Sequence, residues 1–161
     1  MRLRQGATAL ALAAGSIAVT APAAEAHYVY DSGYPYATDR ACTWVRAEVS
    51  HGAYDSGYFK ADTESDWNIL QADCQGSMNR PAGYISARIQ VYKWNGTSWA
   101  LCTQLPTRYN SGTANKLVTS RTYALTPCGP GSYRAGSVGY VYNGAWNGGR
   151  VVTDTWHNLY D

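Results

Sequence analysis

The chain contains three histidines, His27, His51 and His157, and imidazole is the side chain most often used to bind a transition metal. His27 directly follows Ala24-Glu25-Ala26, a small-x-small triplet typical of signal peptidase sites. Cleavage there would leave His27 at the N-terminus, where its α-amine and its imidazole could bind one metal ion together. Nitrogen ligands of this kind suit Cu(II) in a tetragonal plane.

This arrangement resembles the histidine brace of secreted copper oxygenases that attack polysaccharides, in which an N-terminal histidine and one further histidine present three nitrogens. The resemblance rests on His27 and on the β-sandwich fold expected below, and it implies a copper site. We expect His51 to be the partner because it follows a predicted strand, whereas His157 lies near the C-terminus, where chains fray. The alternative is that the leader ends before a histidine by coincidence, or is cleaved after Ala23, and that no metal binds. The rest of the chain predicts no cofactor.

Oxygen-bearing side chains occupy alternate positions in residues 62–68, as they do in calcium-binding loops. An EF-hand loop needs glycine at its sixth position, where this chain has Trp67, and glutamate at its twelfth, where it has Asp73. We therefore predict a solvated acidic loop, with an irregular calcium site as the alternative. Two of these carboxylates could in principle serve as the acid and base of a glycosidase, but no second acidic cluster faces them.

The chain is rich in aromatic residues, with 14 Tyr and 6 Trp but only 1 Phe. Tyr92, Trp94 and Trp99 cluster around Asn95-Gly96, a dipeptide that favours a hairpin turn between two strands. Exposed aromatic rings on one strand face could stack on sugar rings, so we predict that these three residues form a binding site. The alternative is that Trp94 and Trp99 form a cross-strand pair, which would stabilise the hairpin by roughly 0.2–1 kcal/mol.

These features predict a protein that acts by non-catalytic binding to an extracellular glycan, a cell-wall polymer or another protein. A copper-dependent oxidoreductase is the alternative that His27 supports. A secreted protease inhibitor is a third class, and it would need an exposed, rigid loop. The best candidate for such a loop is the Pro- and Gly-rich segment 126–131 around Cys128.

Four cysteines, an even number in a chain that we expect to be exported, indicate two disulfides. Their wide spacing differs from the close cysteine pairs of zinc sites. Three connectivities are open, and we predict Cys42–Cys74 with Cys102–Cys128, because each cysteine lies at the end of a strand-like run. Each bridge would stabilise the fold by roughly 3–4 kcal/mol.

Residues 1–26 combine two arginines, an apolar stretch and a small-x-small triplet, which is typical of a secretory leader. We expect its removal to leave residues 27–161 as a single, secreted, monomeric domain in the extracellular space. That mature chain has 11 basic and 10 acidic residues, interspersed and without a basic run, so we expect no nucleic-acid partner. No later segment is apolar enough to span a bilayer, so we expect no membrane partner.

The elements that must position these residues are all strands. The clearest is residues 84–94, where Ile85, Ala87, Ile89 and Val91 alternate with polar side chains. Similar runs, separated by Gly, Asn and Pro turns, occupy residues 28–30, 42–50, 67–71, 99–102, 116–125, 133–134, 138–142 and 150–156. They predict an all-β fold, a small antiparallel β-sandwich or barrel of about seven or eight short strands with two disulfides.

Overall fold

The computed structural model describes residues 28–38, 40–51, 57–67, 74, 76–155 and 157–159. The predicted leader, its cleavage site and His27 lie outside the described residues. Within the described ranges the chain forms eleven β-strands and no helix. None of these residues therefore belongs to a helix that could cross a membrane.

Eight of the eleven strands have six or more residues, in agreement with the predicted number, and three are shorter. In chain order they are β1 (Tyr28–Ala37), β2 (Cys42–His51), β3 (Gly57–Trp67), β4 (Gly76–Ser77), β5 (Ile85–Trp94), β6 (Trp99–Gln104), β7 (Arg108–Tyr109), β8 (Lys116–Tyr123), β9 (Gly131–Tyr142), β10 (Trp146–Val152) and β11 (His157–Leu159).

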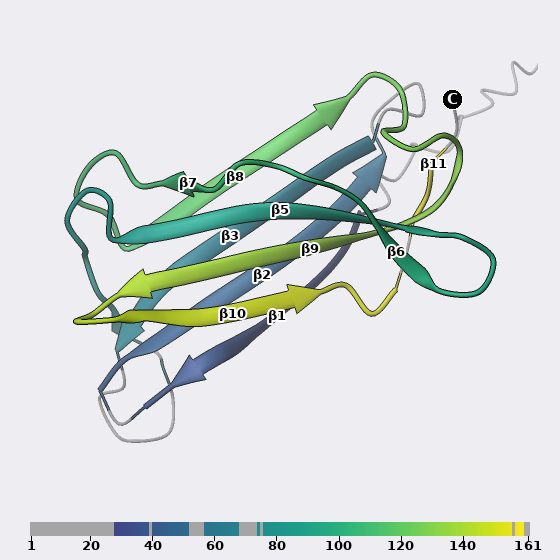
Figure 1. The fold of residues 1–161 in the computed structure, drawn as a ribbon. Helices are drawn as coiled ribbons and strands as arrows, with labels where there is room; N and C mark the ends of the chain where they lie inside the picture. The colour runs from purple at the N-terminus through teal and green to yellow at the C-terminus, as the bar shows by residue number, and fades with distance from the viewer. Residues whose placement is uncertain are drawn as a thin grey trace, which may run out of the picture.

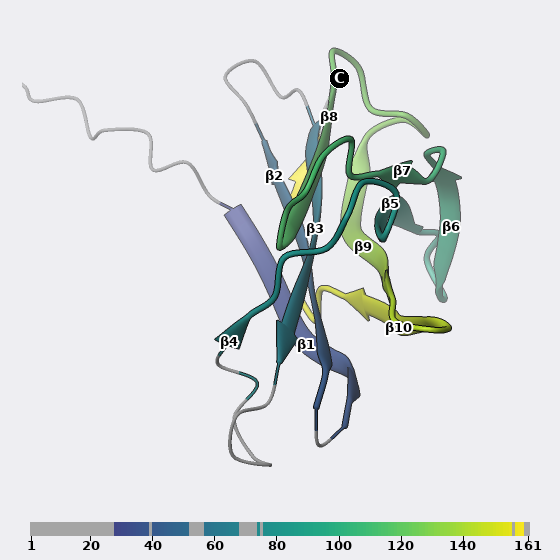
Figure 2. The ribbon, with the colours of Figure 1, turned by 90° about the vertical axis from the view of Figure 1, so that its left-hand side faces the viewer.

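The strands form two antiparallel sheets that pack face to face as a β-sandwich (Figures 1 and 2). The five-stranded sheet has the order β1-β2-β3-β4, and β8 pairs with β3. The six-stranded sheet has the order β10-β9-β5-β6, with β11 paired to β9 and β7 paired to β5. The predicted all-β sandwich is thus confirmed.

The core lies between the sheets and follows the period-2 alternation of the longest strands. The four apolar side chains predicted to share one face of β5 are all fully buried, and so is the matching set on β2. Burial of such side chains stabilises a fold by roughly 1.5–3 kcal/mol each. The fully buried core residues are Val45, Ala47, Val49, Phe59, Ala61, Ile85, Ala87, Ile89, Val91, Tyr133, Ala135 and Leu159. Because these side chains point inward, the alternate residues of β5 and β9 must point outward.

Gly139 on β9 lets the two sheets approach each other closely. A Cβ atom built at this position would lie 2.2 Å from the Thr63 Oγ1 and 2.8 Å from a Val45 methyl group. Real Cβ atoms do not make contacts that short, so any side chain here would push β9 away from the five-stranded sheet. The glycine thus fixes the position of β9, on whose opposite face the candidate site lies.

Both predicted disulfides are confirmed. Cys42–Cys74 joins the start of β2 to the residue that precedes β4 by two positions, with 5.8 Å between the Cα atoms. Cys102–Cys128 joins β6 to the segment before β9, with 6.1 Å between the Cα atoms. Two disulfides fit an oxidising environment such as the extracellular space.

The structure corrects two of the segments predicted as loops or turns. The acidic stretch from Asp62 to Trp67 is not a loop but the second half of β3, paired on both edges. It therefore cannot wrap around a calcium ion, and Asp62 is instead buried beside the Lys60 Nζ, 3.3 Å away. Likewise the turn expected between the predicted strands 138–142 and 150–156 is shorter than that gap, because Asn147-Gly148-Gly149 lies inside β10 and pairs with β9.

Candidate functional site

The outer face of the six-stranded sheet, the face turned away from the five-stranded sheet, carries an unusual number of aromatic and cationic side chains. It is built by direct cross-strand neighbours, whose side chains point to the same side. Ser86 on β5 pairs with Tyr140 on β9, and Arg88 pairs with Val138. On the far edge of β9, Val138 also pairs with Arg150 of β10. Three strands thus place these residues on one surface.

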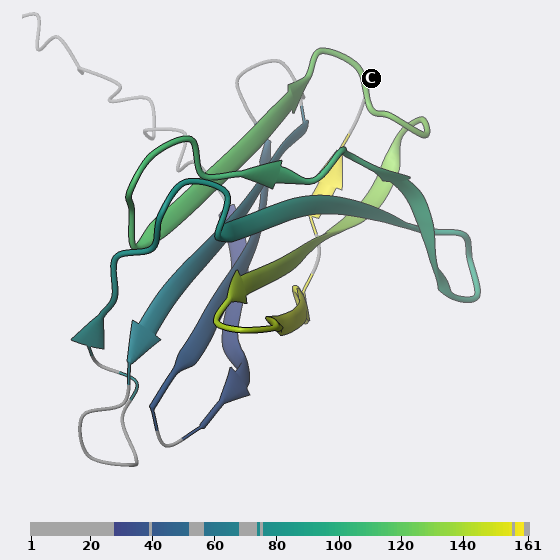
Figure 3. The same ribbon diagram turned by 60° about the vertical axis from the view of Figure 1, so that its left-hand side comes forward.

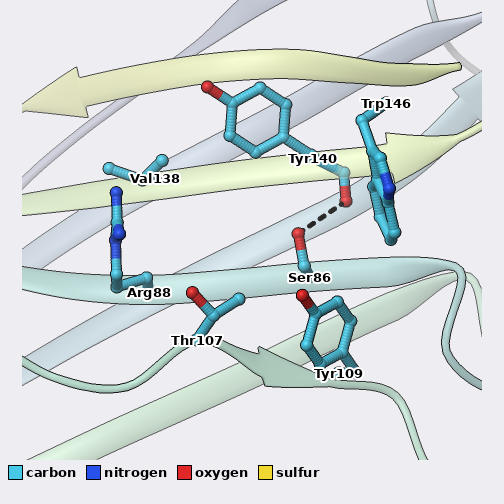
Figure 4. Close-up of a pocket in the computed structure, with 7 residues that line it drawn as sticks. All are labelled: Ser86, Arg88, Thr107, Tyr109, Val138, Tyr140 and Trp146. Atoms are coloured by element: carbon cyan, nitrogen blue, oxygen red, sulfur yellow. Dashed lines mark hydrogen bonds between the residues drawn. The ribbon is translucent and has the colours of Figure 1, made fainter.

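A pocket of about 270 Å³ lies on this outer face (Figure 4). Figure 4 shows Arg88 beside Val138 at one end of the pocket and Trp146 with Tyr109 at the other. The Ser86 hydroxyl donates a hydrogen bond to the backbone oxygen of Tyr140, 3.4 Å away. The pocket is lined by Ser86, Arg88, Thr107, Tyr109, Val138, Tyr140 and Trp146. It therefore combines aromatic surface with hydroxyl and guanidinium donors.

The aromatic end of the pocket belongs to a chain of four rings, here called the aromatic cluster. The Trp146 ring lies 5.9 Å from the Tyr109 ring and 5.5 Å from the Tyr142 ring, and Tyr142 contacts Tyr84 at 5.1 Å between centroids. These edge and tilted contacts are the geometries that aromatic pairs prefer. Even so, Tyr109 is 54% exposed and Trp146 is 46% exposed. The cluster is held in place by its own contacts while offering apolar ring surface to a ligand.

The predicted binding residues lie on the same outer face, at the hairpin end of β5, where the usual rise of a strand places Tyr92 about 20 Å and Trp94 about 26 Å from Ser86. The hairpin is confirmed, with Trp94 paired to Trp99, and it projects beyond the sandwich (Figures 1 and 3). The two indole rings pack at 5.4 Å, and the Arg134 guanidinium lies 4.5 Å from the Trp99 ring. The cross-strand pair therefore forms, and Trp94 nevertheless remains 40% exposed.

Tyr92 is tied into the outer face by its hydroxyl group. It donates a hydrogen bond to the Gln90 Oε1 at 2.8 Å and accepts one from an Arg150 nitrogen at 3.1 Å. Its ring lies over Gly136, where a Cβ atom would approach it to 2.9 Å. Tyr92 is thus anchored to Arg150 of β10, and the binding role of Tyr92, Trp94 and Trp99 stays a prediction.

The pocket residues Tyr109, Tyr140 and Trp146 were missed by sequence reasoning. They come from β7, β9 and β10, and no short sequence window contains them together. The signal that could have found them is the run of outward positions on β9, where Val138, Tyr140 and Tyr142 follow each other at a spacing of two.

The described histidines come together at the other side of the molecule. His51 ends β2, and its ring lies 4.6 Å from that of His157, with an angle of 60° between the planes. His157 is not frayed as expected, because it pairs with Tyr133 as part of β11. His27 lies outside the described residues, although Tyr28, which follows it, pairs with Ser50. Among the described residues no group of three or more His, Cys, Asp or Glu could hold a metal ion.

A second pocket, of about 280 Å³, lies on the outer face of the five-stranded sheet and is acidic. It contains Tyr34, Trp44, Glu64 and Asp66. Burial, and next the nearby Glu64 charge, raise the pKa of Asp66 to about 6. Burial is also the main cause that raises the pKa of the Tyr34 hydroxyl, followed by the charges of Asp66 and Glu64. Glu64 itself is paired with the Lys116 Nζ at 3.3 Å.

The segment predicted as an inhibitory loop is held by several contacts. The backbone nitrogen of Cys128 donates to the Tyr133 hydroxyl at 3.2 Å, and the hydroxyl in turn donates to the Gly129 carbonyl oxygen. Lys93 donates to the Cys128 carbonyl oxygen, and the disulfide to Cys102 adds a covalent link. The loop is therefore rigid, and its inhibitory role stays a prediction.

Comparison with known proteins gives no relative from which a function could be inferred. No family model matches the chain, and no curated protein and no solved structure is significantly similar to it.

Proposed function

We propose that the protein is a secreted, non-catalytic binding protein and that the outer face of its six-stranded sheet binds an extracellular glycan. The observation that carries this proposal is the pocket whose one end is formed by the exposed rings of Tyr109 and Trp146. Flat aromatic rings offer an apolar surface to the C–H face of a sugar. The hydroxyls of Ser86 and Thr107, which line the pocket, match the hydroxyls at the edge of a sugar ring.

The size and openness of the site favour one sugar ring of a longer chain. Its volume of about 270 Å³ lies just below the roughly 300–1,000 Å³ of small-molecule pockets. The ligand would continue along the outer face, over Tyr92 and toward Trp94. In this proposal the pocket fixes one residue of the polymer, and the predicted hairpin aromatics extend the contact.

Trp146→Ala tests the proposal against a matched control. Trp146 and Trp67 are exposed to nearly the same extent, 46% and 47%, but Trp67 lies on β3 of the other sheet. We expect Trp146→Ala to weaken binding to a polysaccharide panel in affinity electrophoresis by about tenfold, the equivalent of roughly 1.4 kcal/mol. Trp67→Ala should leave binding unchanged. Equal losses in both variants, or no binding by the native protein, would contradict the proposal.

Copper binding is a second candidate, and the contact between His51 and His157 favours it. Two imidazoles whose rings are 4.6 Å apart can offer nitrogens to one ion, and an N-terminal His27 would add its amine and imidazole. Copper analysis and electron paramagnetic resonance of the secreted protein test this candidate, with His51→Ala expected to lose the signal. A mature chain that begins at Ala24, or that carries no stoichiometric copper after reconstitution, would contradict it.

A further inference from the structure

The two halves of the sandwich differ sharply in charge. Between Asp73 and Asp154 the chain has no acidic residue, although this stretch contains eight Lys and Arg. The strands of the six-stranded sheet therefore contain five cations and no carboxylate: Arg88, Lys93, Arg108, Arg134 and Arg150. The interpretation of the charges as interspersed is wrong for this part of the chain.

The cations of the two sheets also differ in their partners. Every salt bridge between described side chains lies on the five-stranded sheet, where Arg46, Lys60 and Lys116 pair with carboxylates. On the six-stranded sheet, Arg150 donates to the Tyr92 hydroxyl, and Arg134 lies over the Trp99 ring. Neither arginine forms a salt bridge with a described carboxylate, and Arg134 also donates a hydrogen bond to the backbone oxygen of Asp154.

One of these arginines, Arg88, lines the pocket, and a second, Arg150, lies two strands away on the same face. Arg88 and Arg150 are the cross-strand neighbours of Val138 on its two sides, so their Cα atoms are about 10 Å apart, two strand spacings. Arg88 lines the pocket itself, and its Nε is buried without a hydrogen-bond partner (Figure 4). A buried donor without a partner is unusual in a folded protein. The Nε atoms of Arg46 and Arg134 are buried in the same way, so this feature is not specific to the pocket.

We infer that the glycan is an anionic polysaccharide whose carboxylate or phosphate groups bind between Arg88 and Arg150 while a neighbouring sugar ring stacks on Trp146 and Tyr109. This inference rests on the proposed glycan-binding function and names its ligand class. Guanidinium groups bind carboxylates and phosphates through paired, charge-assisted hydrogen bonds. The aromatic cluster beside the arginines favours a sugar polymer over nucleic acid, since the face lacks the continuous line of cations that tracks a phosphate backbone.

The test compares polymers that differ only in charge. The native protein is titrated with polygalacturonate and with its methyl-esterified form, and with alginate and its carboxyl-reduced form. Polyglycerol phosphate serves as the probe for a phosphate polymer. We expect at least one anionic polymer to bind at least about tenfold more tightly than its reference. The reference is the neutral form of the same polymer for the two polyuronates and the neutral glycans for polyglycerol phosphate. Its affinity should fall as salt rises from about 50 to 500 mM, because salt screens the exposed charges.

Arg88→Gln and Arg150→Gln should each weaken binding of the anionic polymer by about fivefold to tenfold without changing the weak binding of the neutral form. Arg121→Gln, which removes an exposed cation from β8 of the other sheet, is the matched control and should have no effect. Because Arg88 is partly buried, the more exposed Arg150 provides a variant whose folding is not in question. Thermal melting of each variant checks that the fold is retained.

The outcomes separate this inference from the proposed function. If neutral and anionic polymers bind equally well and Trp146→Ala weakens both, the glycan function stands and the inference is overturned. If duplex DNA competes as well as the anionic polysaccharide at equal charge, the inferred ligand class is also wrong. If no polymer binds, both the proposed function and the inference fail.

Discussion

Asp66 is a carboxyl group whose burial makes the stability of the fold depend on pH. It is only 6% exposed, and its pKa is raised from the ordinary value of 3.8 to about 6, mainly by burial and next by the Glu64 charge. Below about pH 4 the carboxyl is protonated in both the folded and the unfolded state. Between about pH 4 and pH 6 it stays protonated in the folded state but ionises in the unfolded state. The free energy of unfolding should therefore fall as the pH rises through this window and stay lower above it.

Asp66→Asn removes this titration and isolates its contribution. One pKa unit corresponds to about 1.4 kcal/mol, so the shift sets an upper limit of about 3 kcal/mol. Screening by nearby solvent reduces the expected effect to about 1–2 kcal/mol. Asp66→Asn should therefore be more stable than the native protein by this amount at pH 7, and the difference should narrow toward pH 4.

Urea unfolding at a series of pH values measures this difference, with Asp154→Asn, a change of an exposed carboxylate in the segment between β10 and β11, as the control. The control should follow the native protein at every pH. If Asp66→Asn is less stable than the native protein at pH 7, or differs from it by the same amount at pH 4 and pH 7, the Asp66 charge does not destabilise the fold and the reasoning is refuted.

Three further predictions concern the hairpin, the disulfides and the sheet contact. Trp94→Ala should weaken polysaccharide binding and cost about 1–2 kcal/mol of stability in urea unfolding, because Trp94 is exposed apart from its pair with Trp99. A cost of about 3 kcal/mol or more would instead mark Trp94 as a core residue. Reduction of both disulfides should cost several kcal/mol, and a melting temperature unchanged within a degree or two would show that they are not structural supports. Gly139→Val should destabilise the fold by more than about 2 kcal/mol, since its Cβ would meet Thr63 and Val45. A variant that melts at the same temperature as the native protein would show that the sheets have room for a side chain there.

The fold could be predicted where side chains alternate in polarity. In β5 the inward residues from Ile85 to Val91 are all apolar, so the strand and its buried face follow directly from the sequence. In β3 the inward positions include Thr63 and Ser65, which hide the alternation, and the acidic outward residues resemble a loop. The segment forms a strand because β3 pairs with a neighbouring strand on each edge, and no local sequence pattern shows this pairing.

Local turn preference was also misleading at the C-terminal end. Gly148 and its neighbours favour a turn, but Trp146–Val152 pairs with β9 along its whole length. The backbone hydrogen bonds of the ladder outweigh the preference of glycine for turns. By contrast, the Asn95-Gly96 turn agrees with the strands on both sides, and there the prediction is confirmed.

The candidate site could be predicted only in part for the same reason. The hairpin aromatics are close in sequence and could be proposed from it, whereas the pocket depends on the registers of β5, β9 and β10. Ser86 meets Tyr140, and Arg88 and Arg150 meet Val138, only because of these registers. The charge difference between the sheets is visible in the sequence, but its meaning depends on knowing that residues 85–94 and 131–152 share one face.

The most direct test of the central claim is to locate a bound polysaccharide on the surface. Hydroxyl-radical footprinting with mass spectrometry reports the oxidation of each exposed Trp and Tyr with and without the polymer. We predict protection of Trp146 and Tyr109 on the six-stranded sheet. Their counterparts of equal exposure on the five-stranded sheet, Trp67 and Tyr30, should be oxidised at an unchanged rate. Protection of Trp67 and Tyr30 with Trp146 and Tyr109 unaffected would contradict the account.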